Sequence, residues 1–142
     1  MKKYILFLLC FSFAATACTH TSDEDQYVVD NRLPEDIEVM YVCRNFQDGD
    51  LQQPDGNAII IDTVFAHQSK HLLYAEQRSM GGPYYAFPSF TVRDMNQDTI
   101  LSWTSQDNME EVNSAWKLEE EVEDKSRYHR HFIHKFVLII DE

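Results

Sequence analysis

The chain has 142 residues, with 24 acidic and 12 basic side chains and a formal net charge of −12 at pH 7. This length is typical of a single domain. The excess of acid argues against a nucleic-acid partner, because contacts to phosphates need clustered Lys and Arg. A hydrophobic content of 44% and an aromatic content of 13% exclude a chain that is disordered throughout.

The N-terminus has the pattern of an export signal. Lys2 and Lys3 precede an apolar run over 4–17, which is shorter than the about 20 residues of a spanning helix. No second apolar run of sufficient length follows, so we expect residues 1–17 to be a cleaved signal peptide.

Ala15-Thr16-Ala17-Cys18 resembles a bacterial lipobox, although Leu is more usual where Ala15 stands. The resemblance implies that Cys18 is lipidated and anchors the protein to a membrane; several acyl chains would hold it firmly. The alternative is an ordinary signal peptide in which Cys18 has no special role. Of the other cysteines, Cys10 lies within the expected signal, so Cys43 remains without a disulfide partner.

The segment after Cys18 is polar and acidic as far as Pro34, which predicts a flexible tether over 18–35 and a folded domain over 36–142. Within it, Ser22-Asp23-Glu24-Asp25 resembles the acidic signal that sends Bacteroidetes lipoproteins to the outer face of the outer membrane. That resemblance implies display on the cell exterior. The alternative is an acidic, solvated linker.

Short β-rich segments alternate with turn signals along the domain. The residues over 37–43 have period-two hydrophobicity, with Cys43 on the inward face. The run 58–66 is rich in β-branched residues and predicts a strand buried on both faces. Further strands are expected at 72–76, 84–93 and 99–103, the last two forming a hairpin.

The segment 107–125 has two alternative interpretations. Asp107 and Glu110 have the spacing of a capping box, which favours a short helix over 107–113. The residues that follow alternate as a strand does and predict a C-terminal hairpin with a loop at 124–126. In that register Glu119, Glu121 and Glu123 lie opposite His131, His129 and Arg127. Together the segments predict an all-β, mainly antiparallel domain, a sandwich or small barrel with at most one short helix.

Two groups of residues have donor atoms that suit a metal ion. His129 and His131 share one face of a strand about 6.6 Å apart, and Glu119 or Glu121 is a possible third ligand. His134 lies on the other face. A surface on which histidines pair with glutamates explains the same pattern, and we expect no metal or other cofactor. The loop residues Asp48, Asp50, Asp55 and Asn57 carry oxygen donors but lack the EF-hand spacing.

The sequence contains no nucleophile elbow, P-loop, dinucleotide fingerprint or zincin helix, so we do not expect an enzyme. The segment 78–85 is the best candidate for binding a protein partner, because it places two tyrosines beside turn-forming residues on a β scaffold. Its residues are Arg78, Ser79, Met80, Gly81, Gly82, Pro83, Tyr84 and Tyr85. Phe87 and Phe90 are expected in the core, and one of the two tyrosines at the surface.

A lipobox, an acidic export stretch and one compact β domain resemble the small surface lipoproteins of Bacteroidetes. Among these the layout is similar to the potempins, lipoproteins that inhibit secreted peptidases. The resemblance implies a protein-binding module on the cell surface whose partner is a peptidase. The motifs that carry it lie within about the first 25 residues, and no inhibitory residue is transferred from the family. The alternative is an accessory lipoprotein of an outer-membrane or fimbrial complex.

Overall fold

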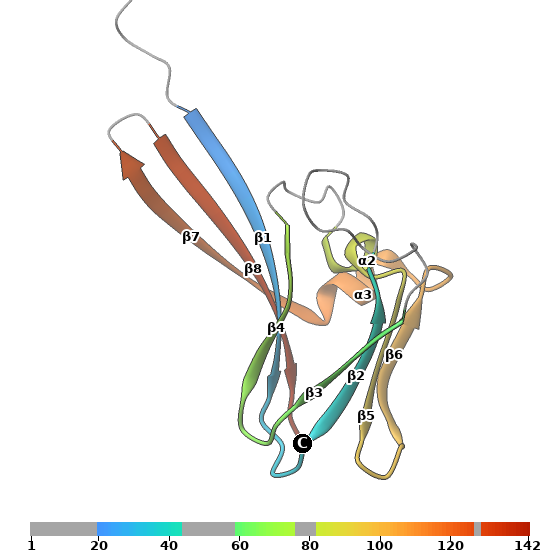
Figure 1. Ribbon diagram of the computed structural model, residues 1–142. Coiled ribbons are helices and arrows are strands. Elements are labelled where there is room, and N and C mark those ends of the chain that lie inside the picture. The colour runs from blue at the N-terminus through green and yellow to red at the C-terminus, as the bar shows by residue number, and fades with distance from the viewer. Residues whose placement is uncertain (1–19, 44–58, 76–81, 127–128) are drawn as a thin grey trace, which may run out of the picture.

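The computed structural model describes residues 20–43, 59–75, 82–126 and 129–142. Over these residues the chain forms two four-stranded sheets that pack as a sandwich (Figure 1). The first sheet has the order β4 (Ser69–Ala75), β1 (His20–Asn31), β8 (His129–Ile140) and β7 (Trp116–Ser126). The second has the order β3 (Ile60–Val64), β2 (Ile37–Val42), β5 (Ser89–Asp94) and β6 (Thr99–Thr104). The expected all-β class is confirmed, as a sandwich and not a barrel.

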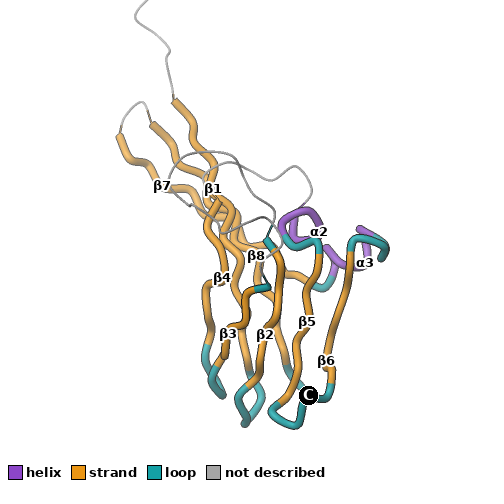
Figure 2. Tube along the Cα trace, turned by 45° about the vertical axis from the view of Figure 1, so that its right-hand side comes forward, coloured by secondary structure: helices purple, strands orange, loops and turns teal. Residues whose placement is uncertain are grey.

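Two short helices, α2 (Gly82–Ala86) and α3 (Met109–Ser114), lie at one end of the second sheet (Figure 2). The helix expected over 107–113 is therefore present as α3. Its N-cap is Asn108, whose Oδ1 accepts from the backbone N–H of Glu110 at 2.9 Å. The expectation of at most one short helix was wrong. α2 occupies the beginning of the segment 84–93, where a strand was expected.

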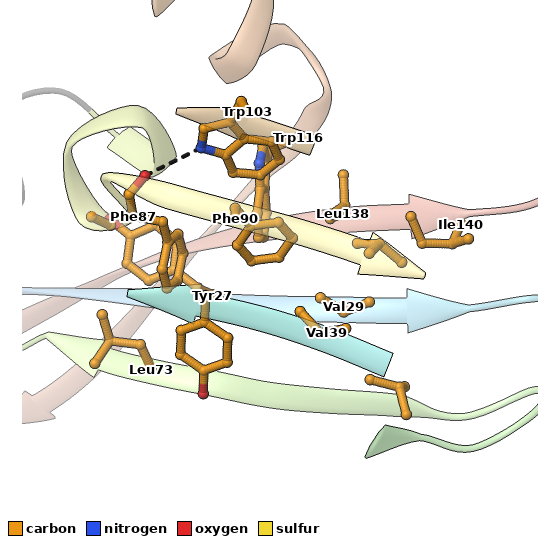
Figure 3. Close-up of a cluster of buried hydrophobic side chains, with 14 of the residues drawn as sticks. Tyr27, Val29, Val39, Leu73, Phe87, Phe90, Trp103, Trp116, Leu138 and Ile140 are labelled. Carbon is orange, nitrogen blue, oxygen red and sulfur yellow. Dashed lines mark hydrogen bonds between the residues drawn. The ribbon is translucent and has the colours of Figure 1, made fainter. Parts of the chain in front are cut away.

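Aromatic rings fill the space between the two sheets. Phe87 has no exposed surface, and its ring centroid lies 5.2 Å from that of Tyr27, 5.5 Å from Tyr41 and 6.0 Å from Trp116. The backbone carbonyl of Phe87 accepts a hydrogen bond from Trp103 Nε1 at 3.2 Å (Figure 3). Each such ring pair contributes about 0.5–1.5 kcal/mol beyond area burial. Phe87, the first residue after α2, thus contacts residues of both sheets and connects them.

The acidic N-terminal segment is a strand and not the flexible tether expected over 18–35. β1 lies between β4 and β8, antiparallel to the first and parallel to the second. Tyr27, Val28 and Val29 are at most 2% exposed. Burial of these three side chains stabilises the strand by several kcal/mol, which explains why polar neighbours do not keep the segment unfolded. The folded domain therefore includes β1, from His20 onward, and does not begin at residue 36.

Several expected strands occur where the pattern placed them. β2 presents Ile37, Val39 and Tyr41 to the core, and β5 and β6 form the expected hairpin. β3 differs from expectation, because Ile59 is 67% and Ile61 59% exposed. Ile61 pairs with Met40 and lies on the outer face of the second sheet, which no further layer of the described residues covers.

The C-terminal hairpin is confirmed, but its register differs from the expected one by four residues. Glu123 lies opposite His131, and Glu119 lies opposite Lys135. β7 extends through Ser126, so the segment 124–126 is not the connecting loop. Arg127 lies outside the described residues. Acidic residues of β7 still lie opposite basic residues of β8, and these cross-strand pairs stabilise the hairpin as they would in the expected register.

β1, β7 and β8 continue beyond the end of β4, whose last residue, Ala75, pairs with Asp25. We call this three-stranded extension, residues 20–24, 121–126 and 129–133, the arm. It projects past the second sheet in both views (Figures 1 and 2). The arm places the N-terminal acidic residues of β1 directly beside the histidines of β8.

Candidate partner-binding surface

The described part of the candidate binding segment is helical. Gly82, Pro83, Tyr84 and Tyr85 lie in α2, whereas Arg78, Ser79, Met80 and Gly81 lie outside the described residues. Gly82 has φ of 63°, and a Cβ atom there would lie 3.3 Å from Asn113 Oδ1. This left-handed conformation suits glycine, and Pro83 then supplies the fixed φ that begins a helix well.

α2 is fixed to the rest of the fold through several contacts. Pro83 and Ala86 are buried, and the carbonyl of Pro83 accepts from the N–H of Phe87 at 2.9 Å. The N–H of Tyr84 donates to Asn113 Oδ1 at 2.9 Å, and its hydroxyl donates to the carbonyl of Ser105 at 2.8 Å. A strand was expected from residue 84 onward, and Gly82–Ala86 instead form a turn of helix that these contacts hold in place.

Tyr85 is the exposed member of the tyrosine pair, with 40% of its surface accessible. Its ring lies against that of Tyr84, at a centroid distance of 5.4 Å and an angle of 85°. The expectation of one exposed tyrosine is thus confirmed, although helical geometry and not strand alternation produces it. Phe87 and Phe90 are fully buried, as expected. The segment therefore presents one tyrosine on a preorganised support.

The histidines of β8 lie on the two faces that strand alternation predicts. His129 and His131 both reach Ser22 of β1, whose Oγ lies 3.0 Å from His129 Nε2 and 2.7 Å from His131 Nδ1. His131 Nε2 lies 3.2 Å from Glu24 Oε2. On the opposite face the buried His134 lies 3.4 Å from Asp23 Oδ1 and from Glu120 Oε1.

The carboxylate partners of this histidine group differ from those expected. Glu24 contacts His131, and it comes from β1 and not from β7, where Glu119 and Glu121 were named. The parallel pairing of β1 with β8 brings Glu24 there, and no local sequence signal reports such a pairing. Within the described ranges, no group of three or more His, Cys, Asp and Glu is arranged to hold a metal ion. The calcium candidates Asp48, Asp50, Asp55 and Asn57 lie outside those ranges.

Cys43 is buried at the end of β2, as its inward position predicted. Burial raises the pKa of the Cys43 thiol to about 11, with the negative charge of Asp62 adding to the shift. A thiol with so high a pKa carries almost no thiolate near neutral pH and is a weak nucleophile. Cys18, the expected lipidation site, lies outside the described residues.

We expect this cysteine to be unreactive in the native protein. A chain from Thr19 onward retains every described residue and has Cys43 as its single thiol. With Ellman's reagent at about pH 8 it should react negligibly when folded, and once per chain in concentrated guanidinium chloride. Because the pKa is raised, native reactivity should appear only as the pH approaches 11. Rapid reaction of the folded chain at about pH 8 would contradict the burial of Cys43.

No helix in the described parts of the chain has the length and apolar character needed to cross a membrane. No family model, no curated protein and no solved structure matches the chain.

Proposed function

We propose that this protein is a lipoprotein of the outer membrane, anchored through Cys18 and displayed on the cell exterior, that acts as a non-catalytic protein-binding module. In its most specific form it inhibits a secreted peptidase. The lipobox-like Ala15-Thr16-Ala17-Cys18 and the acidic stretch from Ser22 support the location. The negative charge favours a basic partner surface.

The observation that carries the binding role is the exposed Tyr85 on the fixed α2 turn. Tyrosine supplies a large contact area with few rotatable bonds, and it is enriched at the centres of protein interfaces. Because buried Pro83 and the two hydrogen bonds of Tyr84 already hold the turn, little conformational entropy remains to be lost on binding. Inhibition would then follow from occlusion, with α2 blocking the entrance of the peptidase cleft.

A residual-activity screen tests this proposal. The chain from Thr19 onward is titrated against metallo-, serine and cysteine peptidases, and we expect stoichiometric loss of activity in one class. Tyr85→Ala should weaken that inhibition by about tenfold or more, the cost of losing an interface anchor. Phe65→Ala is the matched control, since Phe65 is 56% exposed in the turn between β3 and β4, away from α2. Equal loss in both variants would exclude α2 as the binding surface.

An accessory role in an outer-membrane or fimbrial complex is the second candidate, and β7 favours it. This edge strand carries two exposed apolar side chains on one face, Leu118 at 44% and Val122 at 53%. Exposed apolar side chains along a sheet edge are typical of assembly surfaces. Crosslinking on intact cells would then recover a stoichiometric partner, and Leu118→Ser with Val122→Ser should abolish its recovery. No inhibition in the screen together with such a partner would favour this function.

A further inference from the structure

Two imidazole rings on the outer face of the arm are directed at the same point. His129 Nε2 and His131 Nδ1 lie 3.0 Å and 2.7 Å from one atom, Ser22 Oγ. The two histidines are two positions apart on β8, and Ser22 is the β1 partner of His131. Rings that converge on a common point are already oriented as two ligands of one metal ion require.

Glu24, which lies next to His131 Nε2, determines which nitrogen of the neutral His131 ring carries the proton. A carboxylate accepts but does not donate, so in neutral His131 the proton is on Nε2, facing Glu24 Oε2 at 3.2 Å. The lone pair of Nδ1 is then directed towards Ser22 Oγ. Histidines that bind metals commonly donate their second ring N–H to a carboxylate in this way, which orients the ring and raises its basicity.

The charge around the pair favours a cation. On the same face of the arm, Glu123 is the β7 partner of His131, and both Glu121 and Glu24 are partners of Ile133. Lys125 neutralises part of this charge through its contact with Glu123 at 2.7 Å. Glu24 and Glu121 still place negative charge one row from His131 and two rows from His129, which attracts a divalent ion to the arm.

We propose that His129 and His131 bind one divalent transition-metal ion, such as Zn²⁺, with Glu24 positioning His131. Both nitrogens lie within about 3 Å of one point, so small ring rotations, with the Ser22 hydroxyl turned aside, give zinc–nitrogen distances of about 2.0–2.1 Å. No third His, Cys, Asp or Glu of the described residues completes the set, so water or a donor from a bound molecule fills the other positions. This inference does not depend on the proposed peptidase inhibition.

Calorimetric titration of the purified full-length protein with zinc chloride tests the proposal. We expect saturable binding of one zinc ion per chain with micromolar affinity. His129→Asn and His131→Asn should each weaken binding by about tenfold or more, and Glu24→Gln by about tenfold, as for other carboxylates that hold a ligating histidine. His71→Asn is the matched control, since His71 is exposed on β4, outside the arm, and this change should leave the affinity unaltered.

Ser22→Ala separates a metal site from a simple hydrogen-bonded cluster. Removing the hydroxyl frees both ring nitrogens, so zinc affinity should be equal to or greater than that of the unaltered protein. Absence of saturable heat, or binding that persists unchanged in the His129→Asn, His131→Asn double variant, would overturn the proposal.

A measurement on the unaltered chain keeps this test independent of variant folding. The imidazole nitrogen signals of His129 and His131 should shift on zinc addition while those of His71 do not. Signals of His129 and His131 that stay unchanged at saturating zinc would equally overturn the proposal.

Discussion

Phe87→Ala should lower the free energy of unfolding by about 3–5 kcal/mol, the usual cost of emptying a fully buried phenylalanine site. Phe87 has no exposed surface, and its ring contacts those of Tyr27, Tyr41, Phe90 and Trp116. The large cost is expected because these rings come from both sheets and cannot all move inward to fill the space. Urea titration followed by tryptophan fluorescence measures the effect, since Trp103 and Trp116 border the same cluster.

The control is Phe65→Ala, which removes an equally large ring that is 56% exposed, and it should change the free energy of unfolding by about 0.5 kcal/mol or less. Phe87→Leu should be intermediate, because most of the apolar volume is kept. A loss of less than about 1 kcal/mol for Phe87→Ala would show that this ring is not the central contact between the sheets.

A chain that begins at Leu33 should fail to fold, whereas a chain that begins at Thr19 should fold. The shorter chain lacks β1, which pairs with β4 on one side and with β8 on the other. It also lacks Tyr27, Val28 and Val29, whose combined burial is comparable to the margin by which a domain of this size is stable. Near-ultraviolet circular dichroism and amide NMR dispersion distinguish the two chains.

Two single substitutions in the chain from Thr19 onward test the role of β1 without shortening the chain. Val29→Asp places a charge where the side chain is fully buried and should unfold the chain from Thr19 onward, while Gln26→Asp, at a half-buried position of the same strand, should leave it folded. Cooperative unfolding by the chain that begins at Leu33 would contradict the central position of β1 and restore the tether interpretation.

Local patterns in the sequence predicted those elements that have a recognisable period or cap of their own. β2, the β5–β6 hairpin, α3 and the C-terminal hairpin each have a period or a cap that appears within about a dozen residues. The C-terminal register was off by four residues because acid–base pairing is satisfied in more than one alignment. The difference between Glu123 facing His131 and facing Arg127 is only tenths of a kcal/mol to about 1 kcal/mol.

Three elements, β1, α2 and β3, differ from what local patterns predict, each for its own physical reason. β1 was overlooked because four acidic residues surround the apolar triplet Tyr27-Val28-Val29, and its main partner, β8, begins more than one hundred positions later. α2 was overlooked because a single turn has no period to detect. β3 was expected to be buried on both faces because side-chain type does not reveal whether a layer covers each face of the sheet.

At the candidate sites, too, local patterns predicted positions within a strand but not contacts with distant segments. Period-two alternation correctly placed His129 and His131 on one face and His134 on the other. It gave no indication of Ser22 or Glu24, which the parallel strand brings to them. Tyr85 was identified by its residue type, but its support required Asn113 and Ser105, which come from distant segments.

The presence of β1 from His20 onward also limits how far the folded domain would lie from a lipid at Cys18. Only Thr19 separates Cys18 from the first residue of the strand. With the proposed lipid at Cys18, the three-stranded arm would separate the membrane from the sandwich. At about 3.3 Å per residue, the five β1 residues of the arm span roughly 16 Å between the anchor and the sandwich. A partner in the same membrane would then meet the sandwich within a limited range of heights, so geometry as well as intrinsic affinity would decide which neighbours it contacts.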